Sequence, residues 1–216
     1  MEKETVMVFC AHSDDQIFGT GGTLAKYAKQ GHNIVTLIFT IGESSHPHYK
    51  KRVVAEMRMK ETLEANKVIG GGDVVFFGLP ESRTYEEAGK KKIRQKIVKL
   101  INKYKPNKIF THNPDDPHVC HRDVYKITTE IIDKTKYKGE VYVFDVWNFW
   151  NIRKRGLPRL YVDISDTFSL KIKALNCFES QFINAIIPLL WSVYVRAIIH
   201  GIFNQCKYAE RFYKIQ

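Results

Sequence analysis

The chain has 216 residues, 44% hydrophobic and 26% charged, which is typical of one folded domain and excludes a disordered chain. The formal net charge is +11, but no winged, zinc-finger or RNA-binding signature accompanies it, so we do not expect nucleic-acid binding. The four cysteines form no CxxC pair, and the first ten residues do not read as a secretory signal. We therefore expect free thiols and a cytoplasmic location.

Strand and helix patterns alternate along the chain. Residues 5–11 form a continuous apolar, β-branched run, typical of a strand buried on both faces. A turn at residues 12–15 and a helical pattern ending at Gly31 follow. The remaining elements are predicted as strands at residues 33–40, 74–78, 108–111, 140–146 and 160–164, helices at about 17–30, 49–69, 90–104 and 119–133, and helices only after residue 164.

This alternation predicts an α/β fold with a Rossmann-like, mostly parallel sheet and helices on both faces. We expect a single domain over residues 1–216, with a core at about 1–165 and a helical C-terminal segment at about 166–216. In such sheets, ligands bind beyond the carboxyl ends of the strands. The functional residues should therefore lie in the segments that follow strands.

The strongly apolar segment 182–203 approaches the length of a membrane span. It contains Arg196, which would be costly within a bilayer, and Pro188, which interrupts helices. We therefore expect a buried or interface helix broken at Pro188 and no membrane contact. The same apolar stretch indicates that copies of the chain could form a homo-oligomer.

Two polar clusters follow predicted strands. The first, AHSDDQ at residues 11–16, places a histidine and two carboxylates before a glycine-rich helix start. The second, HNPDDPHVCH at residues 112–121, adds three imidazoles and two carboxylates. Catalytic zinc favours three nitrogen or oxygen ligands plus water, so the two clusters together predict a metal site.

Other interpretations explain each cluster alone. The GTGG stretch suggests a dinucleotide fingerprint, although the turn at residues 12–15 occupies the place of its first glycine. Asp14 or Asp15 could simply cap the following helix, and any single histidine could be a surface residue. Cys120 is a rival zinc ligand, but consecutive helical side chains point about 100° apart, which disfavours binding by both Cys120 and His121.

The two clusters resemble the paired motifs of the PIG-L/LmbE-like deacetylases, A-H-P-D-D-E…GG and D-x-H-x-D-H. The similarity extends to the Gly78–Ser82 turn and to late segments around Ser180-Gln181 and Tyr208-Ala209-Glu210. It implies one Zn²⁺ per chain and a small amino-sugar substrate. The roles it implies are metal ligation by His12, Asp15 and His121, general-base catalysis by Asp14, oxyanion stabilisation or amine protonation by His118, and substrate contacts from Arg58 and Glu81.

Three departures from the family pattern put the substrate and the metal affinity in doubt. Ser13 replaces proline, Gln16 replaces glutamate, and Cys120 replaces an aspartate that could orient a histidine. Asp115 is a candidate replacement for that aspartate. Arg58 followed three residues later by Glu61 could equally be a surface ion pair.

The resulting hypothesis is a zinc-dependent hydrolase that removes acetyl from an N-acetylglucosamine-type sugar or glycoside. The alternatives are a zinc amidohydrolase acting on a non-sugar amide and a basic, metal-stabilised module that binds nucleic acid or an anionic surface. Trp147, Phe149 and Trp150 could wall a sugar pocket or form packing contacts.

Overall fold

The structure is a computed structural model that describes residues 2–42, 49–148 and 156–216. Its described strands form one seven-stranded sheet in the order β3-β2-β1-β4-β5-β7-β6. In this order, β3, β2, β1, β4 and β5 run parallel to one another, whereas β7 pairs antiparallel with both β5 and β6. The strands are β1 (Thr5–Cys10), β2 (Asn33–Thr40), β3 (Val74–Leu79), β4 (Lys108–His112), β5 (Glu140–Phe144), β6 (Arg159–Asp163) and β7 (Ala209–Lys214).

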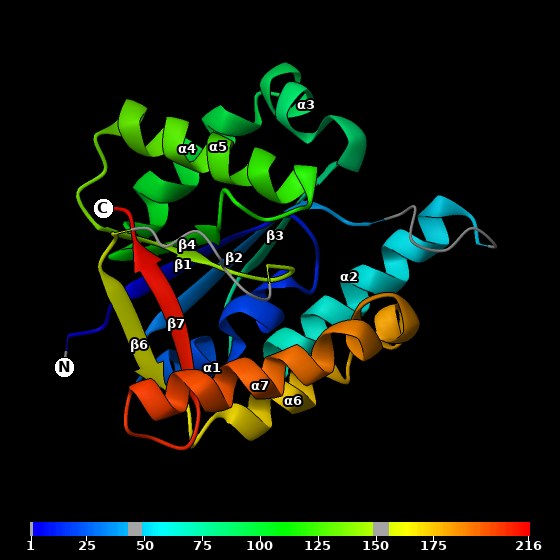
Figure 1. Cartoon of the computed structure of the whole chain (residues 1–216). Helices are drawn as coiled ribbons and strands as arrows, with labels where there is room; N and C mark the ends of the chain where they lie inside the picture. Colours follow the sequence, from blue (N-terminus) through cyan, green and yellow to red (C-terminus); the bar gives the residue numbers. More distant parts are fainter. Residues whose placement is uncertain (1, 43–48, 149–155) are drawn as a thin grey trace.

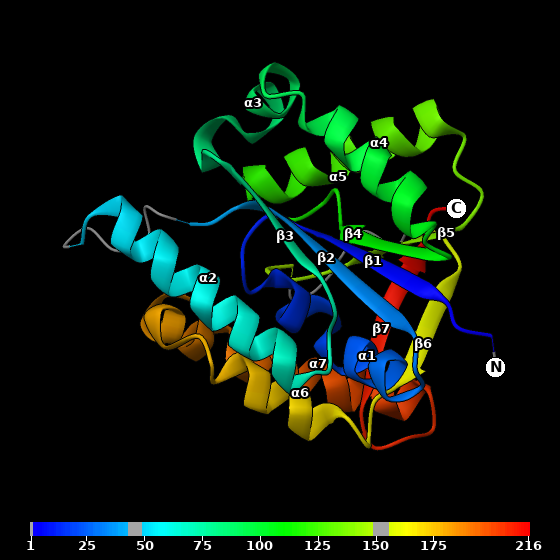
Figure 2. The same cartoon turned by 180° about the vertical axis from the view of Figure 1, so that it is seen from behind.

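Helices cover both faces of the sheet (Figures 1 and 2). Helices α1 (Asp15–Lys29), α2 (Lys51–Val68), α6 (Phe168–Leu175) and α7 (Ile187–Phe203) pack on one face. Helices α3 (Thr84–Lys90), α4 (Ile93–Tyr104) and α5 (Val119–Thr135) lie on the other. Short helical turns η1 (Glu81–Arg83), η2 (Glu179–Gln181) and η3 (Phe182–Ile186) complete the chain. The predicted α/β fold with a mostly parallel sheet is confirmed.

Alternation of side chains along the central strands builds a core on each side of the sheet. In β1, Val6, Val8 and Cys10 join the cluster beneath α1, α2, α6 and α7. Met7 and Phe9 point the other way, into the cluster formed with α4 and α5. Both faces are buried, which explains why the sequence of β1 is continuously apolar instead of alternating.

Three element predictions need correction. The chain ends in a strand, β7, and not in helices alone. The helix expected from residue 90 begins at Ile93, because Lys92 has a φ of 54° and interrupts it. Pro188 does not break its helix: the backbone changes from the π-helical η3 to α7, and Pro188 stands in the first turn, where its missing N–H costs nothing.

A buried ion pair joins the C-terminal strand to the first helix. Lys171 Nζ lies 2.6 Å from Glu210 Oε1 and donates to the Phe18 carbonyl oxygen at 2.7 Å. The Glu210 carboxylate also accepts hydrogen bonds from the backbone N–H groups of Gly22 and Thr23, at 3.1 and 2.7 Å. Residues from α6 and β7 therefore hold the middle of α1 in place.

We expect Glu210→Gln to lower the free energy of unfolding by about 3–5 kcal/mol, because the substitution leaves Lys171 buried without its counter-charge. Glu64→Gln is the matched control, since Glu64 pairs with Lys60 on the exposed face of α2 and should cost less than about 1 kcal/mol. Urea denaturation measures both values. Equal losses in the two variants would contradict the role given to the buried pair.

Candidate metal centre and active site

The two polar clusters meet because β1 and β4 are neighbours in the sheet. Their parallel register pairs Val8 with Phe110, so both strands end at the same edge. A hydrogen bond also joins the two strand ends: the backbone N–H of Ala11, just after β1, donates to Nε2 of His112, the last residue of β4, at 2.9 Å. Helices α1 and α5 both start at this edge and carry Asp15 and His121, whereas His12 and His118 lie in the segments that precede these helices.

The structure brings His12, Asp15 and His121 into one group that could hold a metal ion. His12 Nδ1 lies 3.0 Å from His121 Nε2 and 3.6 Å from Asp15 Oδ2, and His121 Nε2 lies 3.4 Å from Asp15 Oδ1. Ligands about 2.0–2.1 Å from a tetrahedral ion are about 3.3 Å apart, so the donor spacing fits such an ion.

Further side chains orient this donor group from outside. Asp116 Oδ1 lies 3.0 Å from His121 Nδ1, on the ring nitrogen opposite the one that faces Asp15. A carboxylate in this position fixes the tautomer and orientation of a ligating imidazole. Asp115 was suggested above for this role, but the carboxylate that lies on the outer nitrogen of His121 is that of its neighbour Asp116.

His112 belongs to the site, although the sequence analysis gave it no role. Its Nε2 lies 3.1 Å from Asp15 Oδ2, and its ring stacks on that of His121 with centroids 4.0 Å apart. The side chain is fully buried. The signal in the sequence was its position directly after the predicted strand at residues 108–111, at the ligand-binding edge of the sheet.

The adjacent carboxylates of Asp14 and Asp15 have opposite electrostatic environments. Burial raises the pKa of Asp14, an effect that Arg58 opposes and Asp15 reinforces. Burial alone would also raise the pKa of Asp15, but the surrounding His121 and His112 hold it well below its usual range. Neighbouring carboxyl groups whose pKa values are driven apart are suited to different tasks, one anionic and one able to accept a proton.

A cavity of about 140 Å³ opens onto this group. Asp14 lines it, as does His118, whose exposed ring lies 5.1 Å from that of His121 between centroids. Trp147 forms part of the wall and packs 5.2 Å from His118. Phe149 and Trp150 lie outside the described residues.

Arg58 and Glu81 also line the cavity. Arg58 is buried: its Nε donates to Ser13 Oγ at 3.0 Å, and its Nη2 lies 3.4 Å from Asp14 Oδ1. Glu61 is buried too, and accepts hydrogen bonds from the backbone and hydroxyl of Ser180. The interpretation of Arg58 and Glu61 as a surface pair is therefore wrong.

The structure shows what each of the three residues that depart from the family pattern contacts. The Ser13 hydroxyl accepts from Arg58, and Gln16 Nε2 donates to the Ser13 carbonyl oxygen at 2.9 Å, which an ionised glutamate could not do. Cys120 Sγ lies 3.3 Å from His12 Nε2, on the side of the ring away from His121. Cys120 and His121 thus contact different nitrogens of His12, as their helical spacing predicts.

The alternative explanations of the first cluster find no support in the described contacts. Asp14 caps α1 only through its carbonyl oxygen, which accepts from Ile17 and Phe18. The glycines allow close packing: a Cβ on Gly22 would lie 2.6 Å from Ile164, and one on Gly19 would lie 2.2 Å from the Phe144 ring. Their role is contact with the sheet, and no dinucleotide loop is needed to explain them.

With the geometry established, comparison with known proteins gives a consistent result. The family model PIG-L, described as GlcNAc-PI de-N-acetylase, matches residues 7–132, which include every residue of the two clusters. The chain belongs to the PIG-L family. The resemblance inferred from the paired motifs is therefore confirmed.

Several characterised proteins match the chain over most of its length. A diacetylchitobiose deacetylase of Thermococcus kodakarensis is 27% identical over 92% of this chain and 78% of its own. The N,N'-diacetylchitobiose deacetylase of Pyrococcus horikoshii superposes with a TM-score of 0.82 at 20% identity, covering 99% of this chain and 84% of that one. GalB, a 4-carboxy-2-hydroxymuconate hydratase of Pseudomonas putida, superposes with a TM-score of 0.83 at 20% identity, covering 99% and 96%. The PIG-L fold therefore does not by itself decide the reaction.

We expect Asp116→Asn to weaken metal binding about 10–100-fold, because an amide supports the outer nitrogen of His121 less well than a carboxylate. Asp115→Asn, one residue away, is the matched control and should bind as the wild type does. Competition titration with a chromophoric chelator gives both affinities. A larger loss in the Asp115 variant would restore Asp115 as the orienting residue.

Proposed function

We propose that this chain is a zinc-dependent N-deacetylase that releases acetate from an N-acetylglucosamine-type sugar or glycoside. The observation that carries the proposal is the convergence of a three-donor metal group with Asp14 and His118 on one cavity. The family model and the deacetylase relatives support the same reaction.

His12, Asp15 and His121 would hold one zinc ion per chain. Two imidazoles and one carboxylate are a donor set that catalytic zinc uses, with the remaining position open to the cavity. Bound there, zinc would supply Lewis-acid polarisation of the amide carbonyl and a lowered pKa for the attacking water. Asp116 and Cys120 would orient the two imidazoles through their outer nitrogens.

Asp14 would act as the general base. Its carboxylate faces the cavity next to the donor group and is held in place by the buried guanidinium of Arg58. A carboxylate in this position can take the proton of the attacking water as the water adds to the acetamide carbon.

His118 would complete the reaction from the opposite side. Its ring, exposed to the cavity beside Trp147, can donate a hydrogen bond to the oxyanion that develops on the amide oxygen. The same N–H can deliver a proton to the departing amine, so that the C–N bond breaks to leave acetate and a free amino sugar.

Arg58 and Glu81 would bind the sugar. Arg58 presents a buried guanidinium to the cavity, and Glu81, whose side chain is 37% exposed, presents a carboxylate with Oε1 3.7 Å from His12 Nε2. A donor and an acceptor that line the same cavity suit a ring that carries several hydroxyl groups. Trp147 would offer an apolar surface to the sugar face.

We further propose that residues 1–216 act as a single domain in the cytoplasm. The insertion of β7 between β5 and β6 supports one folding unit, because the last strand completes the sheet begun by the first. The four cysteines are unpaired in the structure, in keeping with a reducing compartment.

We expect Asp14→Asn to bind metal as the wild type does while its kcat falls about 10²–10⁴-fold, because the amide cannot accept the proton from water. Metal content measured on the same sample separates loss of the base from loss of the ion. An Asp14→Asn variant with full activity would refute the assignment of Asp14.

Acetate release from a panel of N-acetylglucosamine compounds, including diacetylchitobiose, tests the reaction itself. The protein is stripped with chelator and then assayed with and without added zinc, and we expect zinc-dependent acetate on at least one compound. A zinc-loaded protein that releases no acetate from any of them would overturn the sugar substrate. Release from simple N-acetylated amines alone would favour the non-sugar amidohydrolase, and water addition to an unsaturated acid would favour the hydratase reaction.

A further inference from the structure

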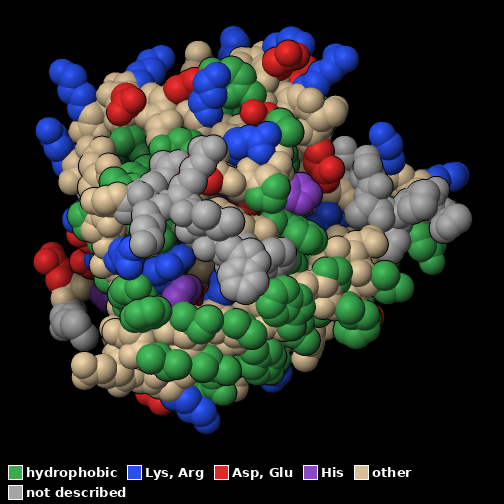
Figure 3. Space-filling view, viewed as in Figure 1, with side chains coloured by type: hydrophobic (Ala, Val, Ile, Leu, Met, Phe, Trp, Pro, Cys, Tyr) green, Lys and Arg blue, Asp and Glu red, His purple; other side chains and the backbone are tan. Residues whose placement is uncertain are grey.

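The exposed side of the helical stretch 182–203 is almost entirely apolar. Ten of the fourteen large hydrophobic side chains that are exposed among the described residues belong to it. Figure 3 shows the hydrophobic side chains gathered over α7. We call this surface the α7 stripe, defined by its most representative members: Ile183, Ile187, Ile198, Ile199, Ile202 and Phe203.

The α7 stripe is not explained as part of the core. The helical stretch Glu179–Phe203 is long and apolar enough to cross a membrane: an 18-residue window within it has a mean hydropathy of 1.8, yet only 33% of that window is buried. The opposite side of the helix packs inward through Leu189, Val193 and Ala197, so the helix cannot leave the fold without exposing the core. A helix fixed in this way can lie along an apolar surface but cannot span one.

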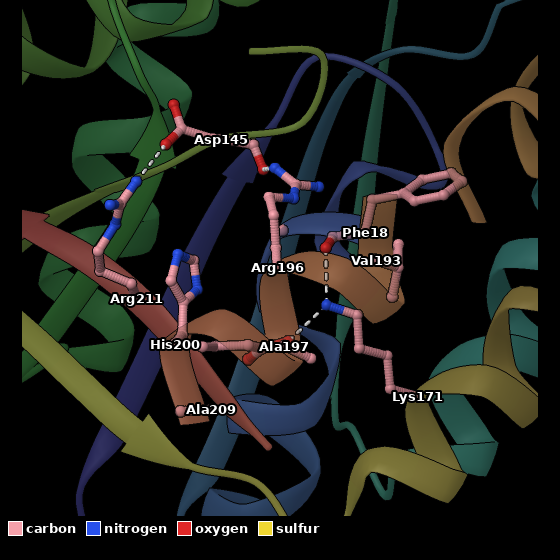
Figure 4. Close-up of a pocket in the computed structure, with 11 residues that line it drawn as sticks. Phe18, Asp145, Lys171, Val193, Arg196, Ala197, His200, Ala209 and Arg211 are labelled. Atoms are coloured by element: carbon pink, nitrogen blue, oxygen red, sulfur yellow. Dashed lines mark hydrogen bonds and ion pairs between the residues drawn. The ribbon is translucent and has the colours of Figure 1, made fainter. Parts of the chain in front are cut away.

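Behind the stripe lies a cationic cavity, shown in Figure 4. Arg196 Nη1 donates to the Asp145 carbonyl oxygen at 3.1 Å, and Arg211 Nη2 lies 3.7 Å from the Asp145 carboxylate. Lys171 also lines it but is paired with Glu210 at 2.6 Å. Three cationic side chains thus face two carboxylates, which leaves the lining with a net positive charge.

Two further observations indicate that the lining of this cavity suits an anion. The Nε of Arg211 is buried and has no hydrogen-bond partner among the described residues. His200 lies in the same wall, where burial and the charges of Arg211, Arg196 and Lys171 lower its pKa to about 3 and keep it neutral. A buried guanidinium N–H without an acceptor is costly, and an anion would satisfy it.

The cavity and the stripe are continuous. Arg196, His200 and Arg211 also line an adjoining surface recess whose other walls come from α7 residues of the apolar face, among them Val195 and Ile199. Donors for an anion therefore lie at the base of an apolar surface. This is the arrangement that fits an amphiphile with an anionic head and an apolar tail.

A second copy of the chain fits this surface less well. Residues 182–203 contain no aspartate or glutamate, so the stripe of another copy brings no acceptor for Arg196 or Arg211. Two chains that each carry a net charge of +11 also repel one another. An anionic bilayer supplies both the apolar phase and the negative charge.

We propose that the α7 stripe docks on the surface of an anionic lipid bilayer and that Arg196 and Arg211 hold a lipid phosphate. In a membrane-spanning helix, the charge of Arg196 would be buried in hydrocarbon, so the sequence speaks against a span. In the structure it points to the protein side of the helix, so a helix lying in the interface keeps this charge out of the apolar phase. The inference does not depend on which reaction the catalytic cavity performs.

Flotation of the full chain with lipid vesicles tests the proposal. We expect binding to phosphatidylcholine vesicles containing about three-tenths phosphatidylglycerol at physiological salt, and much weaker binding to pure phosphatidylcholine. Ile198→Ser with Ile202→Ser should weaken binding about tenfold or more, because two side chains no longer enter the apolar phase. Leu63→Ser is the matched control, an exposed leucine on α2 whose loss should change nothing.

Arg211→Gln separates the phosphate contact from general charge attraction. It should weaken binding to the anionic vesicles about fivefold and leave binding to neutral vesicles unchanged, as expected for one arginine at a membrane surface. Arg52→Gln removes the same charge from an exposed position on α2 and should have no effect. Each variant is first shown to be folded by circular dichroism and thermal unfolding.

Three results would overturn the proposal. The first is a wild-type chain that does not float with anionic vesicles. The second is a loss in the Leu63 or Arg52 controls equal to that in the stripe or Arg211 variants. The third is a stable oligomer in light scattering that Ile198→Ser with Ile202→Ser dissociates while vesicles remain unbound, which would assign the stripe to contact between copies.

Discussion

The site depends on one hydrogen bond between two parallel strands. The backbone N–H of Ala11, just beyond β1, donates to the imidazole of His112, the last residue of β4. This bond sets the distance between the turn that carries His12 to Asp15 and the loop that leads to His118 and His121. The rest of the donor group follows, because the Asp15 carboxylate lies against Nε2 of both His112 and His121, whose rings stack on each other. Parallel pairing thus converts two separate motifs into one site.

The parts of the fold that follow from local pattern could be predicted from the sequence. The β1 and β2 strands are continuous apolar runs because both of their faces are buried, and the helix after β1 shows a clear end signal at Gly31. Strand β7 could not be predicted in this way. Its sequence, AERFYK, mixes charged and aromatic residues, and its pairing is set by contacts with β5 and β6 far away in the chain.

The candidate site likewise has features that could be predicted from the sequence and features that could not. The placement of both clusters after strands was enough to predict one metal site at the edge of the sheet, and the family resemblance implied His12, Asp15 and His121 as its ligands, which the structure groups together. The burial of Arg58 and Glu61 was not predictable from their helical spacing, because their partners, Ser13 and Ser180, come from other segments. The choice of Asp116 over Asp115 as the partner of His121 depends on how one loop turns, which residue type alone does not determine.

The hydrogen bonds between Glu210 and the middle of α1 affect how the chain can fold during its synthesis. The carboxylate that accepts from Gly22 and Thr23 lies 188 and 187 residues away from them in sequence. During synthesis on the ribosome, the helix that starts at Asp15 must therefore wait until residue 210 has been made before these backbone contacts form. Until β7 emerges, the nascent protein holds the turn at residues 12–15 on an unfinished support, and a product truncated before β7 would carry every predicted ligand without the frame that positions them.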